Sequence, residues 1–150
     1  FPALVGWRFI EEAYGVGATP DGRSYGDPIA EHYCATPGKA VKGPTALINS
    51  ICKASLYRAI GVAASHISLP AVISENEENG SALLKALVLA GFDQGMVMIN
   101  IAMYDVESMK KAQLNPELYQ DLIVRVWGFS AKFVDLSHEM QDHIISRVLN

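Results

Sequence analysis

The stretch LIVRVWGFSAKFVDLS, residues 122–137, decides how the end of this chain folds. Its β-branched run at residues 123–126 predicts a short strand. That run stops at Gly128, which stands between the large rings of Trp127 and Phe129, and a glycine in this place predicts a turn. Ser137 has the side chain that caps helix N-termini, and one helical face then carries Met140, Ile144, Ile145 and Val148. The stretch therefore predicts a strand, a glycine loop and a terminal helix.

The residues before this stretch predict further helices and strands. Helical spacing and capping residues indicate helices at residues 45–52, 79–92, 105–114 and 116–122, the first of them capped by Thr45. Strands are expected at residues 59–69 and 96–103, and the second is nearly unbroken apolar, which is typical of a strand covered on both faces. This mixture favours the α/β class, in a single domain that comprises residues 1–150.

Glycine and proline crowd the segment at residues 15–46. Both residues break helices and sheets and favour turns. We therefore expect a long ordered loop or a string of turns there. Loops of this length inside a compact domain more often serve a function than merely connect elements.

Composition and charge exclude several classes of function. Twelve basic residues stand against sixteen acidic ones without a basic cluster, so nucleic-acid binding is not expected. No apolar run approaches the roughly 20 residues that cross a bilayer, so no membrane segment is expected. The two cysteines and the absence of a visible secretory signal favour a cytoplasmic protein. The histidines lack metal-ligand spacing, and Gly15-Val-Gly17 lacks the third glycine of a dinucleotide site, so neither a bound metal nor a nucleotide is expected.

Two regions of the chain resemble the glycyl radical enzymes, the family that includes pyruvate formate-lyase. That family ends in Arg-Val-small-Gly-Tyr, a short acidic turn and a Gln-Asp-x-Ile-Ile helix; residues 125–129 read RVWGF and residues 141–145 read QDHII. Upstream, the sequences GATPDGR (17–23), GDPIA (26–30) and GPTA (43–46) resemble turns at one end of the family's barrel. The resemblance implies the C-terminal part of an α/β barrel, with barrel-end turns at residues 15–46 and a radical loop and C-terminal helix at residues 122–150.

The resemblance also implies that Gly128 stores an organic radical, that a separate radical SAM activating enzyme installs it, and that air cleaves the chain there. A glycine suits this chemistry. Loss of a Cα hydrogen leaves a flat centre that is delocalised over both neighbouring amides, and a side chain would clash with the backbone when the centre flattens. The cofactor is then the backbone itself.

Four neighbours of Gly128 are expected to support the loop. Val126 ends the strand before it, and Arg125 is expected to pin the loop through a bidentate hydrogen bond to a carboxylate. Trp127 and Phe129 are expected to anchor the loop in the core. Both depart from the family pattern, which more often has a small residue before the glycine and a tyrosine after it. No substrate-binding residue is predicted.

The chain lacks the cysteine loop of the family, in which a thiyl radical attacks substrate from a Cys-x-x-Glu sequence. Cys34 is followed three residues later by Pro37, and Cys52 by Ser55. We therefore expect this chain to be inert alone and to pass its radical to a cysteine on a larger partner chain, or on an absent N-terminal part of the same one. The sequence at residues 43–46 resembles the branch of dehydratases, decarboxylases, lyases and alkylsuccinate synthases rather than that of formate acetyltransferase.

Three hypotheses follow from these features. The chain is a radical-bearing small subunit or C-terminal portion of a glycyl radical lyase; or it is a stand-alone spare part that repairs an oxygen-cleaved lyase; or it is a non-catalytic interaction domain that kept the fold. The first is favoured because both motifs are present and the cysteine loop is missing.

Overall fold

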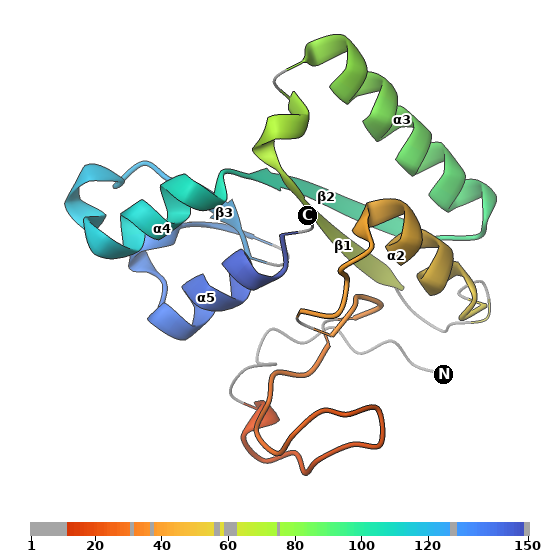
Figure 1. Cartoon of the computed structure of the whole chain (residues 1–150), viewed down its shortest axis with the longest axis horizontal. Helices are drawn as coiled ribbons and strands as arrows, with labels where there is room; N and C mark the ends of the chain where they lie inside the picture. The colour runs from red at the N-terminus through yellow and green to blue at the C-terminus, as the bar shows by residue number, and fades with distance from the viewer. Residues whose placement is uncertain are drawn as a thin grey trace.

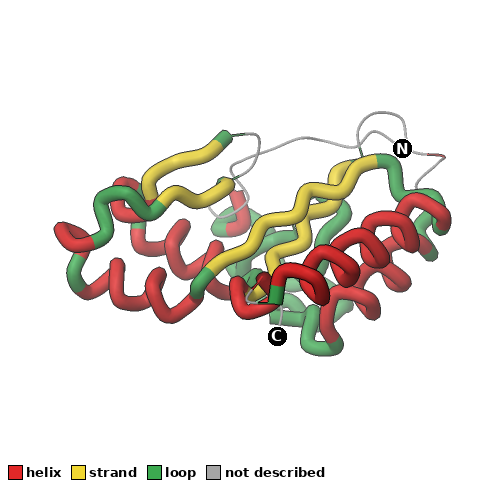
Figure 2. Tube along the Cα trace, turned by 90° about the horizontal axis from the view of Figure 1, so that it is seen from above, coloured by secondary structure: helices red, strands yellow, loops and turns green. Residues whose placement is uncertain are grey.

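The computed structural model of the chain describes residues 12–30, 32–36, 38–55, 58, 63–74, 76–126 and 129–148. Helices and strands are mixed, which confirms the α/β class. Figure 1 shows two groups of elements joined by a pair of long strands: α2 and α3 lie on one side, and α4, α5 and a short hairpin lie on the other. In Figure 2 the strands form one layer and the helices form the layer beneath it.

The first group is a strand–helix–strand unit. β1 (Ala64–Pro70) and β2 (Met98–Tyr104) are parallel neighbours, and the chain between them forms η2 (Ala71–Ser74) and α3 (Glu77–Asp93). Helix α2 (Gly43–Cys52) packs beside α3. Alternate strand residues point toward these helices, because side chains alternate between the faces of a sheet. The core of this group consists of Ile48, Ile51, Ala63, Ile67, Leu69, Leu87 and Met96.

The second group carries the end of the chain. Its elements are α4 (Val106–Leu114), η3 (Pro116–Leu118), the antiparallel strands β3 (Ile123–Arg125) and β4 (Ser130–Lys132), η4 (Phe133–Asp135) and α5 (His138–Ser146). The hairpin lies over α4 and α5 in Figure 2. The core of this second group consists of Tyr104, Met109, Ala112, Val124, Val126, Phe133 and Ile144. Because Tyr104 ends β2, this core joins the hairpin to the long strands.

Capping side chains fix where three of the helices begin. The Asp105 carboxylate accepts the N–H groups of Glu107 and Ser108 at 3.1 and 3.3 Å, and it begins α4 as the sequence predicts. Ser137 Oγ accepts the N–H of Met140 at 3.3 Å, which confirms the predicted cap of α5. The Asn76 side chain caps α3 in the same way. These bonds satisfy N–H groups that a helix cannot satisfy itself.

Four predicted boundaries are wrong. Helix α2 begins at Gly43 rather than after Thr45, so the turn-rich segment ends before residue 46. Proline needs no N–H partner in a first helical turn, and Pro44 therefore suits the first turn of this helix, which has no side-chain cap. The helix predicted at residues 116–122 is the single turn η3, since β3 follows at Ile123.

The two predicted strands also have other bounds. β1 begins at Ala64 and includes Pro70, while residues 59–62 of that predicted strand lie outside the described residues. β2 runs from Met98 to Tyr104 rather than over residues 96–103.

The described strands form two separate two-stranded sheets. β1 pairs with β2 and makes one further bridge, from Ser68 to Val148, so its second edge is partly used. In the part of the chain that the structure describes, β2 has no partner on its other edge. None of the described helices is long and apolar enough to cross a membrane.

Candidate functional site

The hairpin places the two ends of the predicted radical loop side by side. Arg125 pairs with Ser130, and beyond this pair the N–H of Val126 donates to the carbonyl of Phe129 at 3.0 Å. Between these last two residues stand Trp127 and Gly128, which lie outside the described residues. Their predicted roles therefore stay predictions. The described flanks of the loop, Val126 and Phe129, lie side by side at the end of the antiparallel pair.

Buried valines hold the strand that leads into the loop. Val124 and Val126 belong to the core beneath the hairpin, and both side chains are buried. Phe133, which follows the second strand, is fully buried in the same core. The side chain and the N–H of Val126 are therefore both engaged, and its supporting role stays a prediction.

The role of Phe129 as an anchor of the loop stays a prediction, because this chain alone does not bury its side chain. Half of its side chain, 50%, is exposed. The two valines and Phe133 already fill the space beneath the hairpin.

The main chain at Arg125 is held more firmly than its side chain. Among the described residues no carboxylate pairs with the Arg125 guanidinium, so the predicted ion pair stays a prediction. Its main chain instead binds the hydroxyl of Tyr104, which accepts the Arg125 N–H at 3.1 Å and donates to the Arg125 carbonyl at 2.9 Å. Tyr104 is buried at the end of β2, so this pair of bonds ties the hairpin to the long strands.

A second side chain binds the same piece of main chain. Arg147, directly after α5, donates from Nη2 to the Arg125 carbonyl at 2.8 Å and from Nη1 to the Val126 carbonyl at 3.2 Å. Sequence reasoning missed both Arg147 and Tyr104. Arg147 lies in the region, residues 122–150, that is predicted to form the radical loop and the C-terminal helix. Nothing in a sequence, however, shows that a side chain binds carbonyls 21 and 22 residues away.

Helix α5 is itself fastened to the segment that follows the hairpin. The Gln141 side chain is buried and donates to the carbonyls of Phe133 and Leu136 at 3.0 and 3.1 Å. Gln113 of α4 donates to the Asp142 carboxylate at 2.7 Å. Residues on both sides of the loop are therefore bound to one terminal helix.

The turn-rich segment is held by a buried cation. Arg23 donates to the main-chain carbonyls of Val16, Gly17 and Asp27 and thereby binds three turns together. This network accounts for an ordered segment that has little regular structure, as the sequence predicts. Buried arginine is satisfied here by carbonyl oxygens, which is the requirement for any buried charged donor.

The two cysteines lie against main chain in the first group. Burial raises the pKa of the Cys52 thiol, which disfavours the reactive thiolate. The Cys34 sulfur accepts the N–H of His66 at 3.1 Å, and the ring of His66 stacks on that of His32 with centroids 6.0 Å apart. Over the described residues, no group of three or more His, Cys, Asp or Glu side chains is placed to hold a metal ion.

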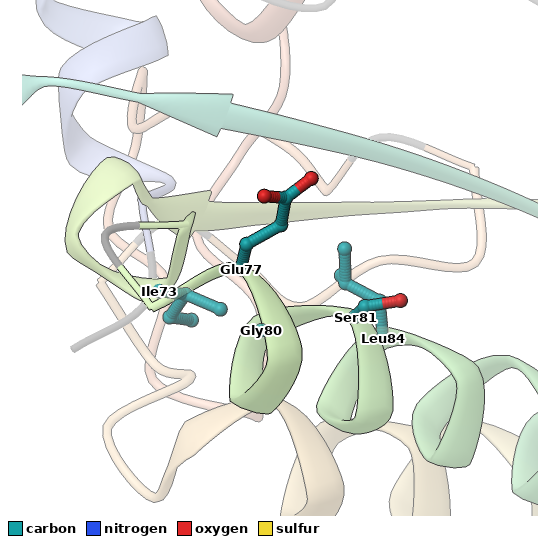
Figure 3. Close-up of a pocket in the computed structure, with 5 residues that line it drawn as sticks. All are labelled: Ile73, Glu77, Gly80, Ser81 and Leu84. Atoms are coloured by element: carbon teal, nitrogen blue, oxygen red, sulfur yellow. The ribbon is translucent and has the colours of Figure 1, made fainter.

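An open hollow of about 240 Å³ lies beside the first turns of α3 (Figure 3). Ile73 of η2 lines one side of it, and Glu77, Gly80, Ser81 and Leu84 of α3 line the other. It contains a single carboxylate and none of the predicted site residues. This hollow therefore provides no reactive cluster.

Comparison with known proteins places the hairpin in a family. The family model described as "Glycine radical" matches residues 29–134, which include the loop. The chain is 36% identical over 132 residues to the trans-4-hydroxy-L-proline dehydratase of Clostridioides difficile, a match that covers 88% of this chain and 16% of the relative. It is 28% identical over 137 residues to formate acetyltransferase 1 of Escherichia coli, covering 87% of this chain and 18% of that protein.

Solved structures of similar proteins point to the same family. The glycerol-bound form of the B12-independent glycerol dehydratase from Clostridium butyricum is 33% identical and superimposes with a TM-score of 0.82. The match covers 95% of this chain and 18% of that one. The chain thus spans less than a fifth of the length of the proteins that it matches.

Proposed function

This chain belongs to the glycyl radical enzymes, and on that premise we propose that it is the radical-bearing small subunit or C-terminal portion of a glycyl radical lyase. Gly128 is the proposed site of the radical. Arg125, Val126, Trp127 and Phe129 are the proposed supports of its loop. The rest of the barrel, with the cysteine that attacks substrate, is contributed by residues outside this chain.

The proposed chemistry is a relay of single hydrogen atoms. A radical SAM activating enzyme, supplied with one electron by a reductant, cleaves its S-adenosylmethionine and supplies a carbon radical. That radical takes one hydrogen atom from Cα of Gly128, so the Cα–H bond breaks and a new C–H bond forms on the carbon that carried the radical. Gly128 later takes a hydrogen atom from the cysteine thiol, which regenerates the Cα–H bond and leaves a thiyl radical to attack substrate. Each step moves one proton together with one electron, so no net charge develops on the loop.

The proposal is carried by a family match that includes the loop, together with hydrogen bonds that hold the main chain on both sides of the loop. A stored radical needs a glycine whose surroundings are fixed, because hydrogen transfer depends steeply on the distance and angle between the reacting atoms. The buried Val126 and the bonded carbonyls of Arg125 and Val126 supply such a frame.

The open sheet supports a barrel that other residues complete. Parallel sheets are normally covered on both faces and rarely stand as two strands. Here β2 exposes Met98 and Met103, at 43% and 42%, and its outer edge is unpaired among the described residues. We infer that further strands of the same barrel pair with this edge, and that this chain is inert without them.

The comparisons also support one branch of the family. Identity to the hydroxyproline dehydratase is 36%, against 28% to formate acetyltransferase 1 over a similar length. We therefore propose a lyase or dehydratase reaction rather than acetyl transfer. The same difference disfavours a repair module for a formate acetyltransferase.

The test is cleavage by air. The complete protein, with every chain that closes its barrel, is activated without oxygen by its activating enzyme and is then exposed to air. Intact-mass analysis should show a cut at Gly128 in the activated sample only, and no cut in Gly128→Ala. The matched control is Gly17→Ala, because a Cβ at Gly17 meets no atom within 4 Å. An uncut activated protein would reject the proposal and would favour a non-catalytic interaction domain.

The identity of the partner separates the remaining alternatives. A subunit joins a chain that ends before the radical motif and has no activity of its own. A repair module instead restores activity to a full-length lyase after air damage. Purification under anaerobic conditions, followed by mass spectrometry of the bound chain, distinguishes the two.

A further inference from the structure

Two side chains from different parts of the fold meet at one carbonyl before the loop. The Arg125 carbonyl accepts the Tyr104 hydroxyl at 2.9 Å and the Arg147 guanidinium at 2.8 Å. Both lone pairs of this oxygen are therefore used. The next carbonyl, that of Val126, accepts the second arm of the same guanidinium at 3.2 Å.

The chemistry of each side chain suits this task. A guanidinium is a rigid planar fork that reaches two acceptors at once, whereas a lysine ammonium is a compact point charge on a flexible stem. A tyrosine hydroxyl both donates and accepts, so it binds the N–H and the carbonyl of one residue together. Bonds from a charged donor are also stronger than bonds between neutral groups.

Both side chains stand on firm supports. Tyr104 is buried at the end of β2. Arg147 lies between helix α5 and Val148, which bridges to Ser68 of β1. Helix α5 is docked through the fully buried Ile144 and through the two bonds of Gln141. The long strands, the terminal helix and the hairpin thus converge on the residues just before the loop.

We propose that Tyr104 and Arg147 are positioning residues of the radical loop. Together they fix the two peptide groups before Trp127, and they thereby set the place of residue 128 relative to the thiol that exchanges hydrogen with it. Arg147 directly follows helix α5, so loop geometry depends on the docking of that helix. This inference rests on the proposed function.

The test measures hydrogen exchange between Gly128 and the thiol, and it needs no substrate. A glycyl radical keeps one α-hydrogen, which splits its electron paramagnetic resonance signal into a doublet. If the radical moves reversibly to a thiol in D₂O, the thiol hydrogen is replaced by deuterium from solvent. Deuterium then returns to Cα, and the doublet collapses to a single line. The rate of collapse reports the geometry of transfer.

The variants are Tyr104→Phe and Arg147→Lys in the complete activated enzyme. Tyr119→Phe is a matched control, because its hydroxyl makes no hydrogen bond recorded among the described residues and its ring packs on the same core. Arg58→Lys is the other control, since Arg58 is exposed. We expect both test variants to keep their radical content and unfolding midpoint while the doublet collapses about tenfold to hundredfold more slowly. The controls should collapse at the wild-type rate.

Other outcomes overturn one proposal or the other. Collapse at the wild-type rate in both test variants would overturn the positioning role and leave the proposed function intact. A lowered unfolding midpoint together with loss of the radical in both variants would show a merely structural role and would also overturn it. A wild-type enzyme that forms no doublet, or whose doublet persists in D₂O, would instead contradict the proposed radical relay.

Discussion

Gly91 allows helix α3 to lie close to β2. A Cβ built at this position would come within 2.7 Å of Ile99 Cδ1 and 3.0 Å of the Met96 sulfur. Both atoms lie near the ends of flexible side chains, so these side chains could shift to make room, but with a loss of packing energy. We expect Gly91→Ala to lower the free energy of unfolding by about 1–3 kcal/mol. Urea denaturation measures this, with Gly17→Ala as the control that has open space; equal stability of the two variants would contradict the close packing.

Phe133 and Phe129 flank the second strand of the hairpin but differ in burial. Phe133 is 0% exposed and Phe129 is 50% exposed. We expect Phe133→Ala to lower the free energy of unfolding by about 3–5 kcal/mol, because it empties a core position. Phe129→Ala should lower the free energy of unfolding by much less in this chain. Thermal unfolding of both variants tests this. A larger loss of unfolding free energy in Phe129→Ala than in Phe133→Ala would show that the core is misassigned.

At the scale of elements, the N-terminus of α4 depends on one carboxylate. The Ser108 hydroxyl donates to Asp105 at 2.5 Å, and this bond, followed by main-chain N–H groups, holds the pKa of Asp105 below its ordinary value of 3.8. A lowered carboxyl pKa stabilises the fold above the ordinary value, and this contribution is lost as the pH falls through the folded pKa. The cap thus favours the fold at neutral pH.

We expect Asp105→Ala to lower the free energy of unfolding at pH 7 by about 1 kcal/mol, the usual loss for a helix cap. The difference from wild type should shrink as acid protonates Asp105. Denaturation measured across a pH series checks this, with the exposed Asp121→Ala as the control. A difference that stays constant into acid would rule out the ionised cap.

The elements that sequence predicts best are those fixed by near neighbours. Asp105 and Ser137 act within three residues of themselves, so their helices begin where expected. Thr45 has the residue type of a cap but lies inside α2, because Pro44 sets the start of that helix. A capping residue alone does not show which turn it caps.

At the scale of the whole molecule, the candidate site combines a motif with distant contacts. The motif around Gly128 is contiguous, so the sequence alone indicates the family that the comparisons confirm. The bonds from Tyr104 and Arg147 join three separate elements, and only the folded chain brings them together. The large ring of Phe129 predicts a core anchor, but whether it is covered depends on residues outside this chain, in which half of its side chain is exposed.

The electron paramagnetic resonance spectrum of the complete protein after anaerobic activation tests most directly whether Gly128 holds the radical. Radical storage at Gly128 predicts a doublet that collapses to a single line when the protein is made with glycine deuterated at its α-carbon, and that is absent in Gly128→Ala. A doublet that survives in Gly128→Ala, or no signal from wild type beside a verified activating enzyme, would contradict it.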